Sequence, residues 1–209
     1  MKMEVTILAK SDKHTGYCVG AITKNGDIVR LVRDEEGHAL NEEQCKFEKM
    51  DSLLIDVTHA PLKHQRENYI LNEVIEKHKS HITINDLTRF LTNPRFIFSN
   101  ENPWLTEEEM QGRKSTLLLV EVDDLQIYQN DEDKFKADFT YNNQAYKKFS
   151  ITDPKFKTRE RKIPKAIVLI SLPDTPYTRY GHELYYKFIS AVYPIKDTEK
   201  SFVFDCYRI

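Results

Sequence analysis

The sequence has few of the features that mark secreted or membrane-spanning proteins. Cys18, Cys45 and Cys206 form no C-x-x-C pair, so we predict neither a disulfide framework nor a cysteine zinc site, and a reducing cytoplasm fits best. The longest apolar runs, such as residues 166–170, fall far below the roughly 18 residues that cross a bilayer. The N-terminal run contains Glu4 and lacks a small-residue cleavage site, unlike a signal peptide. We therefore expect a cytoplasmic protein that contacts no membrane.

The sequence also has few glycines and a net charge close to zero. The chain of 209 residues has 6 glycines but 11% aromatic residues, which favours a packed, β-rich domain over a disordered chain. Charged residues make up 31% of the sequence, yet they balance to a net charge of −2. Any surface that binds nucleic acid must therefore be a local basic patch.

The first sixty residues have the alternation and turn residues of a small β-barrel. Asn25-Gly26 separates two alternating runs and is a strong hairpin signal, because both residues tolerate positive φ. The acidic segment 34–51 is interpreted as a polar connection. Strands are predicted at residues 4–10, 17–23, 27–33 and 53–59.

The middle of the sequence differs in character, and strands resume after Gly112. Residues 68–71 are expected to form a short strand, and Thr83 with Asp86 predicts a capped short helix that ends before Pro94. The acidic residues 107–109 predict a second helical turn. Residues 184–195 are so apolar that their hydrophobic period does not distinguish a helix from a strand. Further strands are predicted at 116–122, continuing over 125–128 past a bulge at 123–124, and at 136–141, 145–152, 165–172 and 201–209, with a turn at 142–143.

Four short motifs carry a resemblance: residues 7–20 with 28–32, residues 65–69, residues 152–154 and residues 186–191. Together they resemble the dual OB-containing domain family of prokaryotes, and we expect a bacterial protein. Two positions differ from the family pattern: Arg66 stands where proline is expected, and Asp12 where a basic residue is common. The resemblance covers nearly the whole chain and implies two OB-like barrels, a role in nucleic-acid binding and no established catalytic residues.

We therefore predict a mainly β (α+β) fold of two tandem OB-like small β-barrels joined by a mixed connector with a short helix. The expected domains are 1–60 for the first barrel, 61–112 for the connector and 113–209 for the second barrel.

The basic segment, residues 155–165, contains six cations and one acid within a net-acidic protein. Such a run can neutralise phosphates, and Phe156 beside it is a candidate stacking face. The alternative interpretation is a solvated loop whose cations balance acids elsewhere. The candidate binding residues here are Lys155, Phe156, Lys157, Arg159, Arg161 and Lys162.

A second candidate, the hairpin cluster, combines cations, an imidazole and an aromatic ring at one hairpin. Gly16 lets the backbone turn closely there. In the alternative interpretation, the Arg30 stem covers apolar surface and its head pairs with Asp27 or Glu35. The members of the cluster are Lys10, Lys13, His14 and Tyr17, with Arg30 and Arg33 on the neighbouring strand, and the candidate binding residues among them are Lys10, Lys13, His14, Tyr17 and Arg30.

Catalytic and metal motifs are weaker, and we predict no catalytic residue, no metal ligand set and no cofactor. Ser11 and His14 lack the elbow that a nucleophile needs. Glu121 and Asp123 resemble the carboxylate pair of a metal-dependent nuclease but lack a lysine two residues further on. His78 and His81, near Glu76, have no third or fourth ligand arranged around them.

Three functions remain. The first is non-enzymatic binding of DNA or RNA, single-stranded or structured. The second is a module that binds a small nucleotide or a protein partner, and the third, least favoured, is a nuclease.

Overall fold

A computed structural model describes residues 1–13, 16–79, 82–179 and 181–195 of the chain. Strands account for most of the regular structure, as the sequence predicts. Among the described residues, no helix has the length and apolar character needed to cross a membrane. The strand predicted at 201–209 lies outside the described residues.

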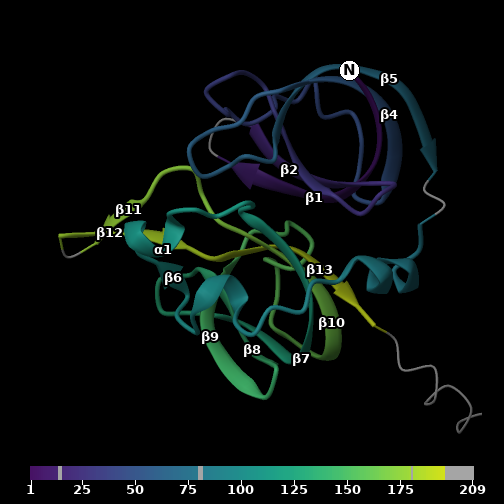
Figure 1. The fold of residues 1–209 in the computed structure, drawn as a ribbon. Coiled ribbons are helices and arrows are strands. Elements are labelled where there is room, and N and C mark those ends of the chain that lie inside the picture. The colour runs from purple at the N-terminus through teal and green to yellow at the C-terminus, as the bar shows by residue number, and fades with distance from the viewer. Residues whose placement is uncertain (14–15, 80–81, 180, 196–209) are drawn as a thin grey trace, which may run out of the picture.

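The first barrel is the upper one in Figure 1. It closes in the order β1-β2-β3-β5-β4, with β3 and β5 parallel and every other pair antiparallel. Alternate apolar side chains of these strands point inward, and Leu40 and Phe47 from the β3–β4 connection complete the core. The strands are β1 (Lys2–Lys13), β2 (Gly16–Thr23), β3 (Ile28–Val32), β4 (Asp51–His59) and β5 (Asn68–Lys79).

Strand β5 is much longer than the short strand expected at 68–71. It completes the first barrel, for which the sequence predicted only residues 1–60. The β4–β5 register shifts between Leu54 and Ile55 and again between Asp56 and Val57. Each shift breaks the two-residue alternation that reveals a strand in a sequence. The connector therefore contributes its first strand to the barrel, while the domain limits themselves stay a prediction.

The connector holds short helical turns close to the predicted places. Thr83 and Asp86 exchange backbone and side-chain hydrogen bonds at the first turn, and Thr106 and Glu109 form a capping box at the second. The first turn is a 3₁₀-helix of six residues. The elements are η1 (Asn85–Phe90), η2 (Ile97–Ser99), β6 (Trp104–Leu105) and α1 (Glu107–Met110).

The second barrel closes in the order β10-β13-β9-β8-β7, with β9 and β13 parallel. The bulge predicted at 123–124 is confirmed, since Asp124 has a φ of 52° and the β7–β8 register shifts there. Residues 184–195 form two strands and no helix. The barrel strands are β7 (Leu117–Gln129), β8 (Phe135–Tyr141), β9 (Gln144–Ile151), β10 (Arg161–Ser171) and β13 (Phe188–Pro194).

An arm formed by β11 (Tyr177–Arg179) and β12 (His182–Tyr186) is inserted between β10 and β13 and pairs with β6. It projects to the left in Figure 1. Glu107 of α1 accepts hydrogen bonds from Lys63 of the β4–β5 loop and Tyr185 of the arm. These bonds, led by the one from Lys63, lower the pKa of Glu107 to about 2. The base of the arm is thereby tied to both barrels.

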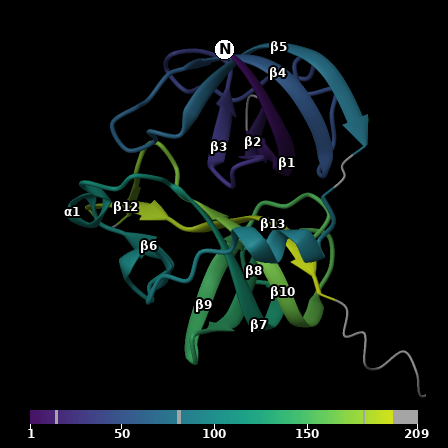
Figure 2. The ribbon, with the colours of Figure 1, turned by 45° about the vertical axis from the view of Figure 1, so that its right-hand side comes forward.

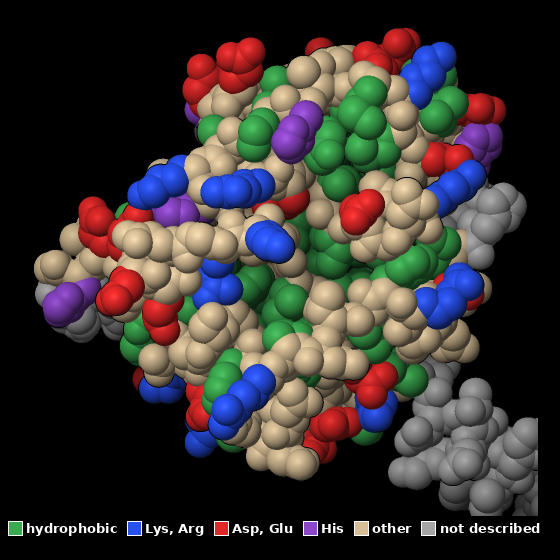
Figure 3. Space-filling view, in the orientation of Figure 1, with side chains coloured by type: hydrophobic (Ala, Val, Ile, Leu, Met, Phe, Trp, Pro, Cys, Tyr) green, Lys and Arg blue, Asp and Glu red, His purple; other side chains and the backbone are tan. Residues whose placement is uncertain are grey.

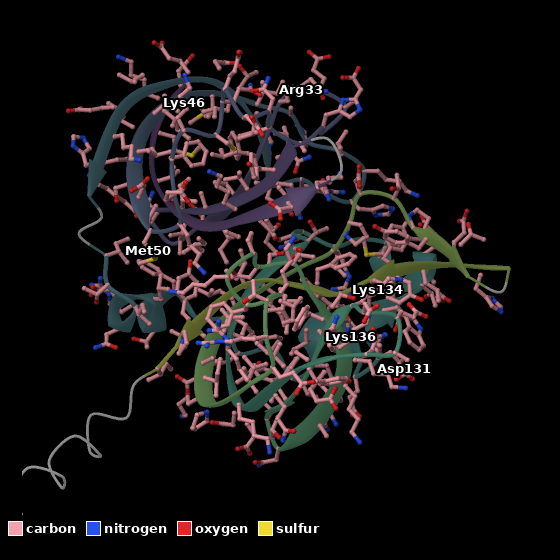
Figure 4. The ribbon with its side chains drawn as sticks, turned by 180° about the vertical axis from the view of Figure 1, so that it is seen from behind. Arg33, Lys46, Met50, Asp131, Lys134 and Lys136 are labelled. Atoms are coloured by element: carbon pink, nitrogen blue, oxygen red, sulfur yellow. The ribbon has the colours of Figure 1, made fainter. Side chains whose placement is uncertain are left out.

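The two barrels pack side by side through a shared apolar layer (Figure 2). Leu8 and Ile22 on the outer face of the first barrel belong to the same cluster as Leu169 and Tyr193 of the second. In the rear view of Figure 4, Met50 lies between the barrels, and it packs against this layer. The apolar run 166–170 is explained by burial on both faces, because alternate residues fill the second barrel and the layer between the barrels.

Both predicted hairpins are present but use different turns. Asn142 and Asn143 have φ of 50° and 61°, as in the two-residue type I′ turn. At Asn25-Gly26, only Gly26 has positive φ, at 90°, and its N–H donates to Thr23 O. The first turn therefore has the three-residue geometry with glycine in the left-handed position, where the sequence predicted positive φ for Asn25 too.

Candidate nucleic-acid interface

A cavity of about 520 Å³ lies between the two barrels. Residues of β1, β2 and β3 line one side of it. The basic segment, the β10–β11 loop and β13 supply the other side. Four of the predicted binding residues, Lys13, Tyr17, Arg30 and Lys157, line this one space.

The cavity joins the two predicted clusters. Lys157 of the basic segment pairs with Asp12 of β1 at 2.5 Å, and Lys13 of β1 lies 3.8 Å from Asp174 of the β10–β11 loop. Each barrel thus contributes one cation and one carboxylate to two ion pairs that cross the boundary. All four residues are partly or fully exposed, so the pairs are hydrated and each stabilises the fold by no more than about 1 kcal/mol.

Lys10 and Tyr17 of the hairpin cluster form a supporting pair. The Lys10 ammonium donates to Cys45 O and Phe47 O, each at 3.0 Å, and pairs with Glu48. It also lies 4.8 Å from the centre of the Tyr17 ring. Lys10 therefore anchors the segment 45–48 and fixes the ring that lines the cavity. His14 lies outside the described residues.

Arg30 requires a correction, because it is only 8% exposed and lies at the floor of the cavity. Its Nη2 donates to Thr116 Oγ1 at 3.0 Å and to Leu172 O at 3.2 Å, and the same nitrogen lies 3.9 Å from Glu67 Oε1. The expected partners Asp27 and Glu35 are thus replaced by Glu67. Tertiary contacts between the barrels bury this guanidinium, so it offers no surface for a nucleic-acid backbone.

Phe156 also requires a correction. The ring is 2% exposed and belongs to the core of the second barrel, so it offers no stacking face. Arg161 lies over this ring at 4.7 Å and donates to Lys155 O, which makes it part of the same turn. Lys155, Arg159 and Lys162 are exposed, and they remain candidates for contacts with phosphate.

Sequence reasoning missed Tyr177 at the start of the arm. The ring is 54% exposed and lines the cavity. Its edge contacts with Tyr186 and Phe188, at 5.9 and 6.3 Å between ring centres, hold it in place. The signal available in the sequence was weak: an aromatic residue directly after the turn residues Pro173 and Pro176.

The carboxylates of the nuclease hypothesis are neutralised by one lysine. Lys165 lies 2.8 Å from Glu121 and 3.7 Å from Asp123. The hydrogen bond and charge of Glu121 raise the pKa of Lys165. This arrangement is that of a cross-strand ion pair, since Lys165 is directly opposite Asp123 in the β7–β10 ladder.

Within the described part of the chain, the ligand atoms of Asp34, Glu36 and His38 are close enough together to approach one metal ion. Those atoms lie within 4.8 Å of one another in an exposed loop. Asp34 is already engaged by His38 and Arg33, and acidic groups of this kind are common without an ion.

The other cations on the surface are distributed widely. On the face drawn in Figure 3, Lys and Arg side chains are interspersed with Asp and Glu. On the opposite face, Figure 4 labels Lys134 and Lys136 on the second barrel and Arg33 and Lys46 on the first. Lys134 pairs with Glu132, and Lys136 donates to Ser150. The distribution of surface charge therefore singles out neither of these two faces.

Two closed five-stranded barrels with the same strand order define a tandem OB-fold protein. The chain belongs to the dual OB-containing domain family, whose model matches residues 3–192. No curated protein matches the sequence significantly. Among solved structures, the chain is similar to the crystal structure of the tetrameric p202 HIN2, with 13% identity, a TM-score of 0.36 and coverage of 94% of this chain and 92% of that chain. That likeness is too weak to carry an argument about function.

Proposed function

We propose that the protein binds nucleic acid, without catalysing a reaction on it, at the interbarrel cavity and along the exposed part of the basic segment. The observation that supports this best is the meeting of two clusters far apart in sequence. Lys13 and Lys157 border one cavity together with the rings of Tyr17 and Tyr177. Cations for phosphates and aromatic faces for bases are the components that single-strand binding requires.

The ion pairs at the cavity rim favour a ligand of high negative charge. Asp12 and Asp174 occupy Lys157 and Lys13 in the free protein. A phosphate can displace either carboxylate at little cost, because exposed pairs are weak. Each phosphate neutralised contributes to the salt dependence of binding, with a slope of about −0.7 per contact for a single strand.

The test is fluorescence anisotropy with single- and double-stranded DNA and RNA oligonucleotides at two salt concentrations. The wild-type protein should bind single strands or structured RNA with salt-dependent affinity. The double variant Lys13→Ala, Lys157→Ala should bind more weakly to every sequence, and its salt slope should be smaller by about 1.4. Tyr177→Ala should weaken binding about tenfold, within the range of one lost stacking contact.

Lys147→Ala, Lys148→Ala is the matched control, because both lysines are exposed on β9 and neither lines the cavity. It removes the same charge and should retain more of the affinity than the rim variant does. Equal losses in the two double variants would show that only net charge matters. Unchanged affinity in the rim variant would move the contact to Lys155, Arg159 and Lys162.

A small-nucleotide binding module is the second candidate, and the enclosed volume favours it. A cavity of about 520 Å³ falls within the range of roughly 300–1,000 Å³ typical of small-ligand sites. Oligonucleotide binding that persists at high salt would favour the module over the nucleic-acid function. Binding to a protein partner that persists at high salt would favour it too.

A further inference from the structure

Arg30 presents a buried donor that the fold leaves unused. The side chain lines the cavity and is more than nine-tenths buried, and Nη2 is engaged by Thr116 and Leu172. The Nε atom is buried and has no hydrogen-bond partner among the described residues. A buried donor without an acceptor costs roughly 1–3 kcal/mol. Because Arg30 lines the cavity, a ligand that seats against this side chain can supply the acceptor.

The charge at the floor suits a neutral acceptor better than a phosphate. Glu67, 3.9 Å from Arg30, compensates the guanidinium charge. A phosphate carried to this depth would lose its hydration and meet a nearly neutral ion pair. A carbonyl oxygen or a ring nitrogen needs only the single N–H that Arg30 offers.

The walls between the floor and the rim suit a flat apolar group. They include Tyr17, Leu31, Leu172 and Phe188, and Cys18 also lines the cavity. Lys13 and Lys157 stay at the exposed rim. From floor to rim, the cavity thus offers a donor, apolar walls and two cations. A nucleotide matches this arrangement, since its base is flat and carries acceptors while its phosphate is charged.

We propose that the cavity takes up one nucleobase, from a strand end or an unstacked position, with Arg30 Nε donating to an acceptor on its edge and the phosphate held at the rim by Lys13 and Lys157. This rests on the proposed function and specifies its ligand. Guanine offers two adjacent acceptors, O6 and N7, whereas adenine places its N6 amino donor beside N7. The single Arg30 N–H can therefore donate to either of two neighbouring atoms of guanine, whereas on adenine it can donate only to N7 and meets a second donor beside it. The pocket accordingly prefers guanine to adenine.

Cys18 gives a direct readout, because this residue is half-buried and lines the cavity. Cys45 is buried, and burial raises its pKa to about 11, so it stays unreactive at neutral pH. In a Cys206→Ser background, alkylation by N-ethylmaleimide at pH 7.5 should modify Cys18 alone and be followed by mass spectrometry. Saturating GMP should slow this reaction at least fivefold, and AMP at the same concentration should slow it less.

Two variants complete the test. Cys18→Phe fills the cavity without changing a charge and should weaken GMP binding at least tenfold, while Lys147→Ala, Lys148→Ala should leave it unchanged. Arg30→Lys retains the charge opposite Glu67 and should abolish the preference for GMP over AMP, with folding verified by circular dichroism.

The outcomes separate this inference from the proposed function. If oligonucleotides bind the wild-type protein but GMP does not protect Cys18 and Cys18→Phe binds them normally, the base pocket is refuted and nucleic-acid binding stands. Protection by GMP without any oligonucleotide binding would support the pocket and overturn the proposed function. If neither ligand binds, both fail.

Discussion

At the scale of single residues, the environment determines what each cation does. Lys10 and Lys187 both donate to backbone carbonyls, and neither is available to a ligand as a free surface charge. Lys187 is fully buried, and its ammonium donates to Ile97 O, Asn100 O and Asn100 Oδ1 at 2.7–2.8 Å. It thereby fastens the connector to the second barrel.

Burial lowers the pKa of Lys187 to about 7, although the charge of Glu109 partly opposes this. In the unfolded chain the lysine keeps its usual pKa near 10.5. Between these values the unfolded state binds more protons, so this group makes the free energy of unfolding rise with pH. We expect the free energy of unfolding of the wild-type protein to gain on that of Lys187→Met between pH 7 and 9. The difference between the two should grow by up to about 1.4 kcal/mol per pH unit.

Urea titrations of both proteins at several pH values provide this measurement, and tyrosines and histidines common to both proteins cancel in the difference. The variant should also be less stable at every pH in this range, because three carbonyl acceptors lose their donor. If the difference in free energy of unfolding does not change with pH, the carbonyls keep the Lys187 ammonium charged in the folded state.

At the scale of elements, the loops of the barrels differ more than their strands do. Between its second and third strands, the first barrel has a three-residue turn, whereas the second barrel has the two-residue turn Asn142-Asn143. The second barrel also carries the arm between its fourth and fifth strands. OB-folds commonly bind ligands with the loop at this position. The arm brings Tyr177 to the cavity, which makes it the element that most distinguishes the second barrel.

The two asparagine turns should respond oppositely to glycine. Asn143 has a φ of 61°, so Asn143→Gly removes strain and completes the favoured Asn-Gly type I′ turn. We expect this variant to be more stable by about 0.5–1 kcal/mol. Asn25 does not have positive φ, so Asn25→Gly should cost about 0.5–1 kcal/mol in backbone entropy.

Thermal unfolding of the two variants beside the wild-type protein measures both shifts. Asn25 is exposed, and so is Asn143, which makes the two substitutions a matched pair. Stabilisation by both glycines would indicate that Asn25 also adopts a left-handed conformation, as the sequence alone suggested.

At the scale of the whole molecule, a buried polar network and an apolar layer join the barrels. Glu67 accepts hydrogen bonds from Thr116 N, at 2.9 Å, and from Thr116 Oγ1, and it compensates Arg30. Gln65 adds a bond to Leu172 O. The layer around Leu169 and Tyr193 is buried and adds apolar contacts between the barrels.

Glu67→Ala should destabilise the protein by about 3–5 kcal/mol, because it leaves the buried Arg30 guanidinium without its counter-charge and the buried Thr116 N–H without its acceptor. Urea unfolding measures the change through circular dichroism of both barrels and fluorescence of Trp104, the single tryptophan. The wild-type protein should show one coincident transition by both probes, since the barrels share a core layer.

Glu121→Ala is the control, because its pair with Lys165 is partly exposed and should contribute no more than about 1 kcal/mol. Separate transitions for the two probes, or equal losses in the two glutamate variants, would contradict a cooperative interface.

The sequence by itself determined the features that depend on neighbouring residues. Side-chain alternation located most of the barrel strands, and turn chemistry located both hairpins, the bulge at Asp124 and the hydrogen-bonded turn of Thr83 and Asp86. The family motifs predicted two OB barrels, which the family model and the strand order confirm. These features succeed because a turn or a strand face is specified within a few residues.

Only the tertiary structure decided which side chains a ligand can reach. Alternation places Arg30 and Phe156 on a face but does not reveal what covers that face. The second barrel covers Arg30, and Phe156 packs within a core. The contact between Lys157 and Asp12 joins positions 145 apart in sequence, and the exposure of Tyr177 depends on how the arm folds back. Such contacts arise from long-range packing, which no local pattern records.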